Sequence, residues 1–151
     1  MDPFFQDYYD RLSTLHNDLA ATVEGLTAEG LDWRPGPDTN SLVVLLTHTA
    51  GSERYWIGEI VGQEPAGRIR AQEFETLGKT AEQLQERLDL ALAHSRQTLS
   101  ALSLDNLVEA RLIPEQGRSC TVAWALLHAL EHTAQHVGHA QLTRQMWEEL
   151  R

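Results

Sequence analysis

Four stretches of the chain carry apolar residues at steps of three and four positions, and segments rich in proline and glycine separate the first two. Such spacing places the apolar side chains on one face of an α-helix, and that face has to pack against another helix. The predicted helices cover residues 2–25, 41–61, 80–102 and 119–150. No segment alternates as a convincing strand does. The sequence therefore predicts an all-α fold, a four-helix bundle.

Each predicted helix begins at a residue whose side chain can cap it. The capping residues are Asp2 before Pro3, Ser41, Thr80 in a capping box with Gln83, and Ser119 or Thr121. The second helix opens with the run 42–46, which is apolar nearly all round. We therefore expect this end of the second helix to be buried on every side.

The connections between the helices differ in length and composition. Residues 26–40 hold two prolines and two glycines, so we expect an ordered loop without regular structure. Residues 62–78 are long for a link within a bundle, which permits a crossover rather than a tight turn. Residues 103–118 are predicted to hold a short extended piece around Leu112, before a turn at Gln116 and Gly117.

The composition limits the function classes. A chain of 151 residues suits a single domain, expected to span 1–151. A formal net charge of −10 disfavours binding to nucleic acid or to an anionic membrane, and no apolar stretch is long enough to span a bilayer. The single cysteine, Cys120, cannot form an internal disulfide and is expected to be buried. A single cysteine fits a reducing compartment, and the N-terminus is unlike a signal peptide. Both features predict a cytoplasmic location.

Seven histidines are many for this length, and four of them lie in the last predicted helix: His128, His132, His136 and His139. Steps of four place imidazoles on neighbouring turns, and the pair His132 and His136 has the HxxxH spacing of helical metal sites. His48 follows an apolar run, where an imidazole is costly unless its nitrogens are satisfied. HxxxH also occurs by chance in packed or surface helices. The sequence nevertheless favours a metal site formed by His48, His132 and His136.

The other histidines receive simpler interpretations. His16 and His94 have polar neighbours and are predicted to lie at the surface. His128 and His139 either support the metal ligands from behind or only flank them.

Catalytic residues are harder to predict. Tyr55 and Trp56 follow His48 on the same helix and either line a pocket or pack in the core. Glu53 is either a surface charge, a partner of the metal ligands or a base. The sequence has no HExxH, no Glu-x-x-His, no glycine-rich phosphate loop and no G-x-S-x-G elbow. Catalytic and cofactor-binding residues therefore stay unassigned.

Three stretches in the right order resemble the DinB/YfiT-like superfamily. They are GLTAEGLDWRPGPDTNSL before the second helix, LVVLLTHTAGSERYWI within it and LLHALEHTAQHVGHAQLTR in the last helix. By this resemblance the metal histidines of the family fall on His48, His132 and His136. Many members continue His-Arg-Gly-Gln, whereas this chain has Val137 and His139 at the arginine and glutamine positions. A role for His139 near the site is therefore open.

The resemblance implies a bundle with a long crossover connection, one divalent metal ion and often a homodimer. Zinc or nickel is the expected metal, and iron also suits three imidazoles. Apolar residues near the chain ends, such as Phe5 and Trp147, are expected to be exposed, which is compatible with a homodimer. Characterised relatives act on small molecules with low-molecular-weight thiols such as mycothiol or bacillithiol, as S-transferases or as a maleylpyruvate isomerase.

Three neutral histidines leave a metal ion with open positions, as catalytic sites do. The leading expectation is a metal-dependent thiol S-transferase, in which a thiol bound as thiolate attacks an electrophilic small molecule. Two alternatives use the same three ligands. One is a metal-dependent hydrolase with metal-bound hydroxide as nucleophile, and the other is a non-catalytic metal-binding stress-response protein.

Overall fold

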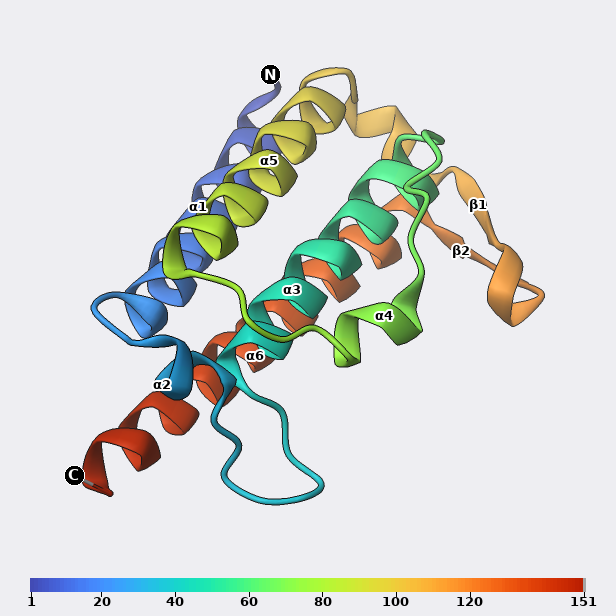
Figure 1. The fold of residues 1–151 in the computed structure, drawn as a ribbon. Coiled ribbons are helices and arrows are strands. Elements are labelled where there is room, and N and C mark those ends of the chain that lie inside the picture. The colour runs from blue at the N-terminus through green and yellow to red at the C-terminus, as the bar shows by residue number, and fades with distance from the viewer. Residues whose placement is uncertain (151) are drawn as a thin grey trace.

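The computed structural model describes residues 1–150, which form a four-helix bundle (Figure 1). Its long helices in this part of the chain are α1 (Pro3–Val23), α3 (Leu42–Glu53), α5 (Ala81–Ser100) and α6 (Val122–Glu149). The helix α3 continues as a π-helical segment, η1 (Arg54–Val61). Both α1 and α3 pack against α5 and α6, so the four helices enclose one interior. The predicted all-α bundle is confirmed.

The connection between α3 and α5 is a crossover. Figure 1 shows α3 and α5 running in the same direction, so the chain has to return along the bundle between them. The returning segment carries a short helix, α4 (Arg70–Phe74), which packs against α3. The long connection predicted over residues 62–78 is thus confirmed as the crossover.

The helix starts are set by the predicted caps. The side chains of Asp2, Ser41, Thr80 and Thr121 accept hydrogen bonds from the main-chain amides of Phe4, Val44, Gln83 and Trp124. Thr80 and Gln83 form the full capping box. Of the two residues predicted to open the last helix, Thr121 rather than Ser119 does so, because Thr121 directly precedes α6 and its side chain accepts the hydrogen bond from Trp124.

Two short elements differ from the prediction. The segment 26–40, expected to lack regular structure, contains α2 (Ala28–Asp32). The cap of α2 makes no side-chain hydrogen bond, and Leu31 is buried, so tertiary packing rather than a local signal holds this helix. Residues 103–121 contain two 3₁₀ segments, η2 (Leu104–Val108) and η3 (Pro114–Gln116).

The same segment also forms a β-hairpin, which the sequence did not predict. The strands β1 (Ala110–Ile113) and β2 (Arg118–Thr121) pair antiparallel, with Arg111 opposite Cys120. The predicted extended piece and turn are confirmed, since Gly117 adopts the left-handed conformation that closes the hairpin. Cys120 is half-buried rather than fully buried, and burial raises the pKa of its thiol.

The interior contains two apolar clusters stacked along the bundle. One includes Phe5, Ile57 and Leu126, and the other includes Leu46 and Leu88. The run 42–46 is buried throughout, as predicted. Phe5 and Trp147, expected to be exposed, are also buried, because both helix ends turn these side chains inward. Within residues 1–150, no helix is long and apolar enough to cross a membrane.

Candidate metal centre

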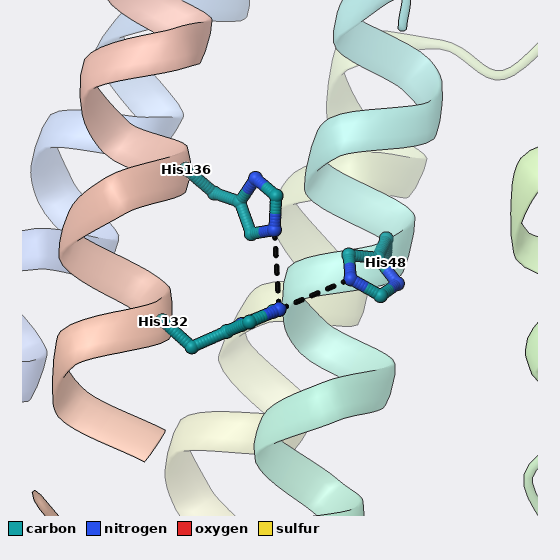
Figure 2. Close-up of side chains that lie close together, drawn as sticks. All are labelled: His48, His132 and His136. Carbon is teal, nitrogen blue, oxygen red and sulfur yellow. Dashed lines mark hydrogen bonds between the residues drawn. The ribbon is translucent and has the colours of Figure 1, made fainter. Parts of the chain in front are cut away.

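Three imidazole rings meet between α3 and α6 (Figure 2). His48 projects from α3, whereas His132 and His136 project from successive turns of α6. The Nε2 atom of His132 lies 3.1 Å from Nε2 of His48 and 3.1 Å from Nε2 of His136. One nitrogen from each ring lies within 4.8 Å of the other two. The structure therefore brings together the three residues that the sequence singled out.

The spacing of the nitrogens fits a small divalent ion. Two ligand nitrogens at about 2.0–2.1 Å from a tetrahedral zinc ion are about 3.3 Å apart. The two close Nε2 pairs have nearly this separation. His48 is buried, and the other two rings are half-buried. The donor set and the distances thus suit a metal ion with at least one position left for another ligand.

Two of the three rings are held neutral, which is the form that binds metal. Burial lowers the pKa of His132 to about 3, and the neighbouring rings of His136 and His48 add to the effect. Burial also lowers the pKa of His136 to about 4, with contributions from His48 and His139. At neutral pH, protons therefore do not compete for these two nitrogens.

A carboxylate orients the third ring. The Nδ1 atom of His48 donates to Oε2 of Glu73 on α4, at 2.8 Å. Arg68 holds the same carboxylate with two hydrogen bonds, Nε to Oε1 at 2.7 Å and Nη2 to Oε2 at 2.8 Å. Burial alone would raise the pKa of Glu73, but the bonds from Arg68 and His48 outweigh it and hold the pKa below its usual value. Glu73 is therefore ionised at neutral pH.

This contact fixes the tautomer of His48. Because the N–H on Nδ1 donates to Glu73, the lone pair of a neutral His48 ring lies on Nε2, which faces the two histidines of α6. Nη2 of Arg68 also lies 3.3 Å from Nδ1, but a guanidinium can only donate, so the carboxylate at 2.8 Å is the acceptor for the Nδ1 proton. A carboxylate behind a histidine ligand is the usual support of a metal site.

The close approach of Glu73 to α3 depends on Gly51, one turn after His48. A Cβ atom at this position would lie 2.0 Å from Oε1 of Glu73 and 2.9 Å from its Cδ. Any larger residue would have to displace the carboxylate. Gly51 thus belongs to the site, although it touches none of the proposed ligand nitrogens.

The two histidines left open by the sequence have different surroundings. Nδ1 of His139 lies 3.3 Å from Nδ1 of His136, so His139 can support that ring from behind. His128 is not part of the cluster; its ring stacks on Trp124 at 4.9 Å and meets the edge of Trp56 at 4.6 Å. Burial lowers the pKa of His128. His128 therefore belongs to an aromatic group beside the site.

The aromatic residues that follow His48 are buried, as the packing interpretation predicted. Tyr55 and Trp56 belong to the apolar cluster near Phe5. Arg68 lies 5.7 Å above the ring of Tyr55. Within residues 1–150, the buried hydroxyl of Tyr55 has no hydrogen-bond partner, and burial raises its pKa.

The surface prediction for His16 is wrong. His16 is 3% exposed and its Nε2 contacts a carboxylate oxygen of Glu53, which is 1% exposed. Ser95 donates to the other oxygen of Glu53 at 2.7 Å. We call His16, Glu53 and Ser95 the polar layer, because they lie between the two apolar clusters. His94 is half-buried and contacts Glu64 at 2.8 Å.

The sequence held a signal for the polar layer. His16 follows Leu12 by four positions and precedes Leu19 by three, so it lies in the apolar stripe of α1. The residues Ala50, Glu53 and Ile57 continue the same spacing on the second helix. Glu53 therefore faces α1 and α5 and does not contact the three histidines. Arg68 and Glu73, by contrast, lie in an aperiodic connection, and no sequence pattern pointed to them.

The comparisons with known proteins agree with this fold. The profile of the mycothiol-S-transferase family matches residues 9–148. No curated protein matches the chain. A conserved protein from Enterococcus faecalis superposes with a TM-score of 0.77 at 17% identity, over 95% of this chain and 96% of that one.

Two further solved structures are similar over most of both chains. A DinB-like protein from Bacillus cereus ATCC 10987 has a TM-score of 0.75 at 13% identity, covering 93% of this chain and 91% of the other. YfiT from Bacillus subtilis has a TM-score of 0.77 at 14% identity, covering 97% and 89%. The structures support the fold, and the family profile spans nearly the whole sequence. The chain therefore belongs to the mycothiol-S-transferase family, within the DinB/YfiT-like superfamily.

Proposed function

We propose that His48, His132 and His136 bind one divalent metal ion through their Nε2 atoms, with zinc or nickel as the metal and iron as a less favoured candidate. The observation that carries this proposal is the bond from His48 Nδ1 to Glu73, which directs the free nitrogen of His48 at the other two rings. A carboxylate behind one ring nitrogen, with the opposite nitrogen facing two further imidazoles, is the arrangement that orients histidine ligands of metal ions.

We further infer that the protein is a metal-dependent enzyme of the thiol S-transferase type. Three protein ligands leave positions for a further group, as in catalytic zinc sites. A divalent ion at this site would supply Lewis acidity, which lowers the pKa of a coordinated thiol or water. Membership of the mycothiol-S-transferase family supports a small-molecule thiol as co-substrate. The residues of the chain contribute by keeping two ligands neutral and the third oriented.

Metal binding can be tested on protein purified without a histidine tag and reconstituted with zinc or nickel. Elemental analysis should give about one equivalent in the wild type and a large loss in His132→Ala. His128→Ala is the matched control, since His128 lies one turn away on α6 and outside the cluster. Less than about a tenth of an equivalent in the wild type would contradict the proposed site.

The transferase activity can be tested by incubating the metal-loaded protein with an electrophile and each of several cellular thiols. We expect turnover that requires both the thiol and the metal, and that is lost in His132→Ala. Turnover that continues after removal of the metal would contradict this mechanism.

A metal-dependent hydrolase is the second candidate. YfiT, which shares the fold, is described as a probable metal-dependent hydrolase. Hydrolysis of an ester or amide without any thiol, abolished by removal of the metal, would favour this activity. A non-catalytic stress-response protein would instead bind metal and ligand without turnover of either substrate class.

A further inference from the structure

A cavity lies beside the candidate metal centre. It has a volume of about 560 Å³ and is lined by residues of α3, α4, α5 and the crossover segment before α4. This volume is typical of a pocket for a small molecule. The lining includes Glu73 but none of the three proposed metal ligands. The cavity is thus separate from the histidine cluster. The two share only the carboxylate of Glu73, which lines the cavity and accepts the hydrogen bond from His48.

The charge of this cavity is opposite to that of the protein. Its lining contains four of the 12 lysine and arginine residues but only one of the 22 acidic residues, Glu73. The four cations are Arg54, Arg68, Lys79 and Arg87, and Lys79 is the only lysine in the chain. The lining of this cavity therefore carries a local excess of positive charge in a chain with a formal net charge of −10.

Among residues 1–150, three of these cations have no carboxylate partner. Arg68 is neutralised by its two bonds to Glu73. Arg54 reaches only the main-chain carbonyls of Glu64 and Pro65, both at 3.4 Å. In the part of the chain that the structure describes, Arg87 and Lys79 make no hydrogen bond or ion pair.

The helix spacing explains why Arg87 stays unpaired. A charged residue on a helix pairs with residues three or four positions away. For Arg87 these positions hold Gln83, Leu84, Leu90 and Ala91, and none of them is acidic. The acidic neighbours Glu86 and Asp89 point to other faces of α5. The sequence thus leaves a guanidinium at the cavity without an internal counter-charge.

We propose that this cavity binds the anionic group, a carboxylate or a phosphate, of a small molecule through Arg54, Lys79 and Arg87. Guanidinium groups bind either anion with paired, charge-assisted hydrogen bonds. Thr47 and Thr76 also line the cavity and place hydroxyl donors there. Apolar residues such as Ile69 and Leu90 give the remainder of the ligand a surface to pack on. The proposal does not depend on a metal at the histidine cluster.

The binding can be measured by isothermal titration calorimetry with inorganic phosphate and with succinate as probes. The titrations use the 151-residue protein as purified, at low and constant ionic strength, because exposed cations are screened by salt. The test variants are Arg87→Gln and Lys79→Gln, which remove one charge each from exposed positions. Arg11→Gln is the matched control, since Arg11 is exposed on α1 and does not line the cavity.

We expect saturable binding of at least one probe, weakened about tenfold in each test variant and unchanged in Arg11→Gln. Binding of only one probe would support the site and identify the anionic group. Absence of binding by both probes would overturn the proposal. Binding that resists both substitutions but disappears when the metal is removed would also overturn it, because the anion would then lie on the metal.

Discussion

Replacing Glu73 by glutamine tests how the candidate metal centre is built. The substitution keeps the shape of the side chain but removes the charge that accepts the proton of His48 Nδ1. An amide can present its NH₂ group to Nδ1 as easily as its oxygen, and the tautomer of His48 is then no longer fixed. We therefore expect Glu73→Gln to bind metal more weakly while the three proposed ligands remain in place.

The size of the effect follows from the contact. The bond from His48 to Glu73 is 2.8 Å long, and the two side chains are only 7% and 4% exposed. A hydrogen bond to a charged group contributes about 1.5–3 kcal/mol, and loss of such a support typically weakens metal binding about 10- to 100-fold. We expect a loss within this range, together with some loss of stability, because Arg68 also loses its partner.

A competition titration against a chromogenic zinc chelator measures the affinity directly. Glu75→Gln is the matched control, because Glu75 is exposed two positions further along and makes the same change of charge. Circular dichroism confirms that both variants are folded at the temperature of the titration. If folded Glu73→Gln bound zinc as tightly as the wild type, the carboxylate would not orient His48 and our account of the site would be wrong.

Three further predictions concern the same site and its surroundings. Gly51→Ala should weaken zinc binding about as much as the change at Glu73, because its Cβ would lie 2.0 Å from that carboxylate; unchanged affinity in the same titration would refute this. In metal-free protein, the low pKa values of His132 and His136 keep both rings neutral in the folded state below pH 6.5. The unfolded state takes up protons at these residues in the same range. The free energy of unfolding should therefore fall by about 2–4 kcal/mol between pH 7.5 and pH 5. Urea unfolding at the two pH values measures the change, and equal stabilities would contradict it. Tyr8→Phe should cost about 1 kcal/mol in the same assay, because the buried hydroxyl donates to a main-chain carbonyl of α6 at 2.7 Å.

The sequence predicted the long helices well because their signals are local. Caps such as Ser41 and the box of Thr80 with Gln83 involve residues three positions apart, and the structure contains them as predicted. The short helix α2 was missed because distant residues hold it: Trp33, at the end of α2, lies against Trp147. The hairpin was missed because Ile113 of β1 is buried against the residues of the cluster that includes Phe5 and Ile57, which are distant in the sequence. The single domain, the cytoplasmic location and the homodimer remain predictions.

The candidate site was predictable only in part. The histidines of α6 are paired by helical spacing, and His48 was found by its place in an apolar run. Glu73 lies 25 positions from His48 in the sequence, and their contact exists only because the crossover folds α4 back onto α3. No periodic pattern within residues 62–78 encodes that return, so the support of the site could not be inferred from local sequence.

The rotation of α3 about its own axis also could not be predicted from the sequence. A helix that is buried on every side has no apolar stripe that determines which face meets which neighbour. His48 and Glu53 are five positions apart, which places them about 140° apart around the axis. One therefore contacts His132 and Glu73, while the other contacts His16 in the polar layer. We infer that these two polar contacts together set the rotation of α3, since turning the helix to satisfy a different partner would leave a buried group unpaired. Replacing Glu53 by leucine should then weaken zinc binding even where the fold survives. If Glu53→Leu kept the zinc affinity of the wild type, apolar packing alone would fix the orientation of His48.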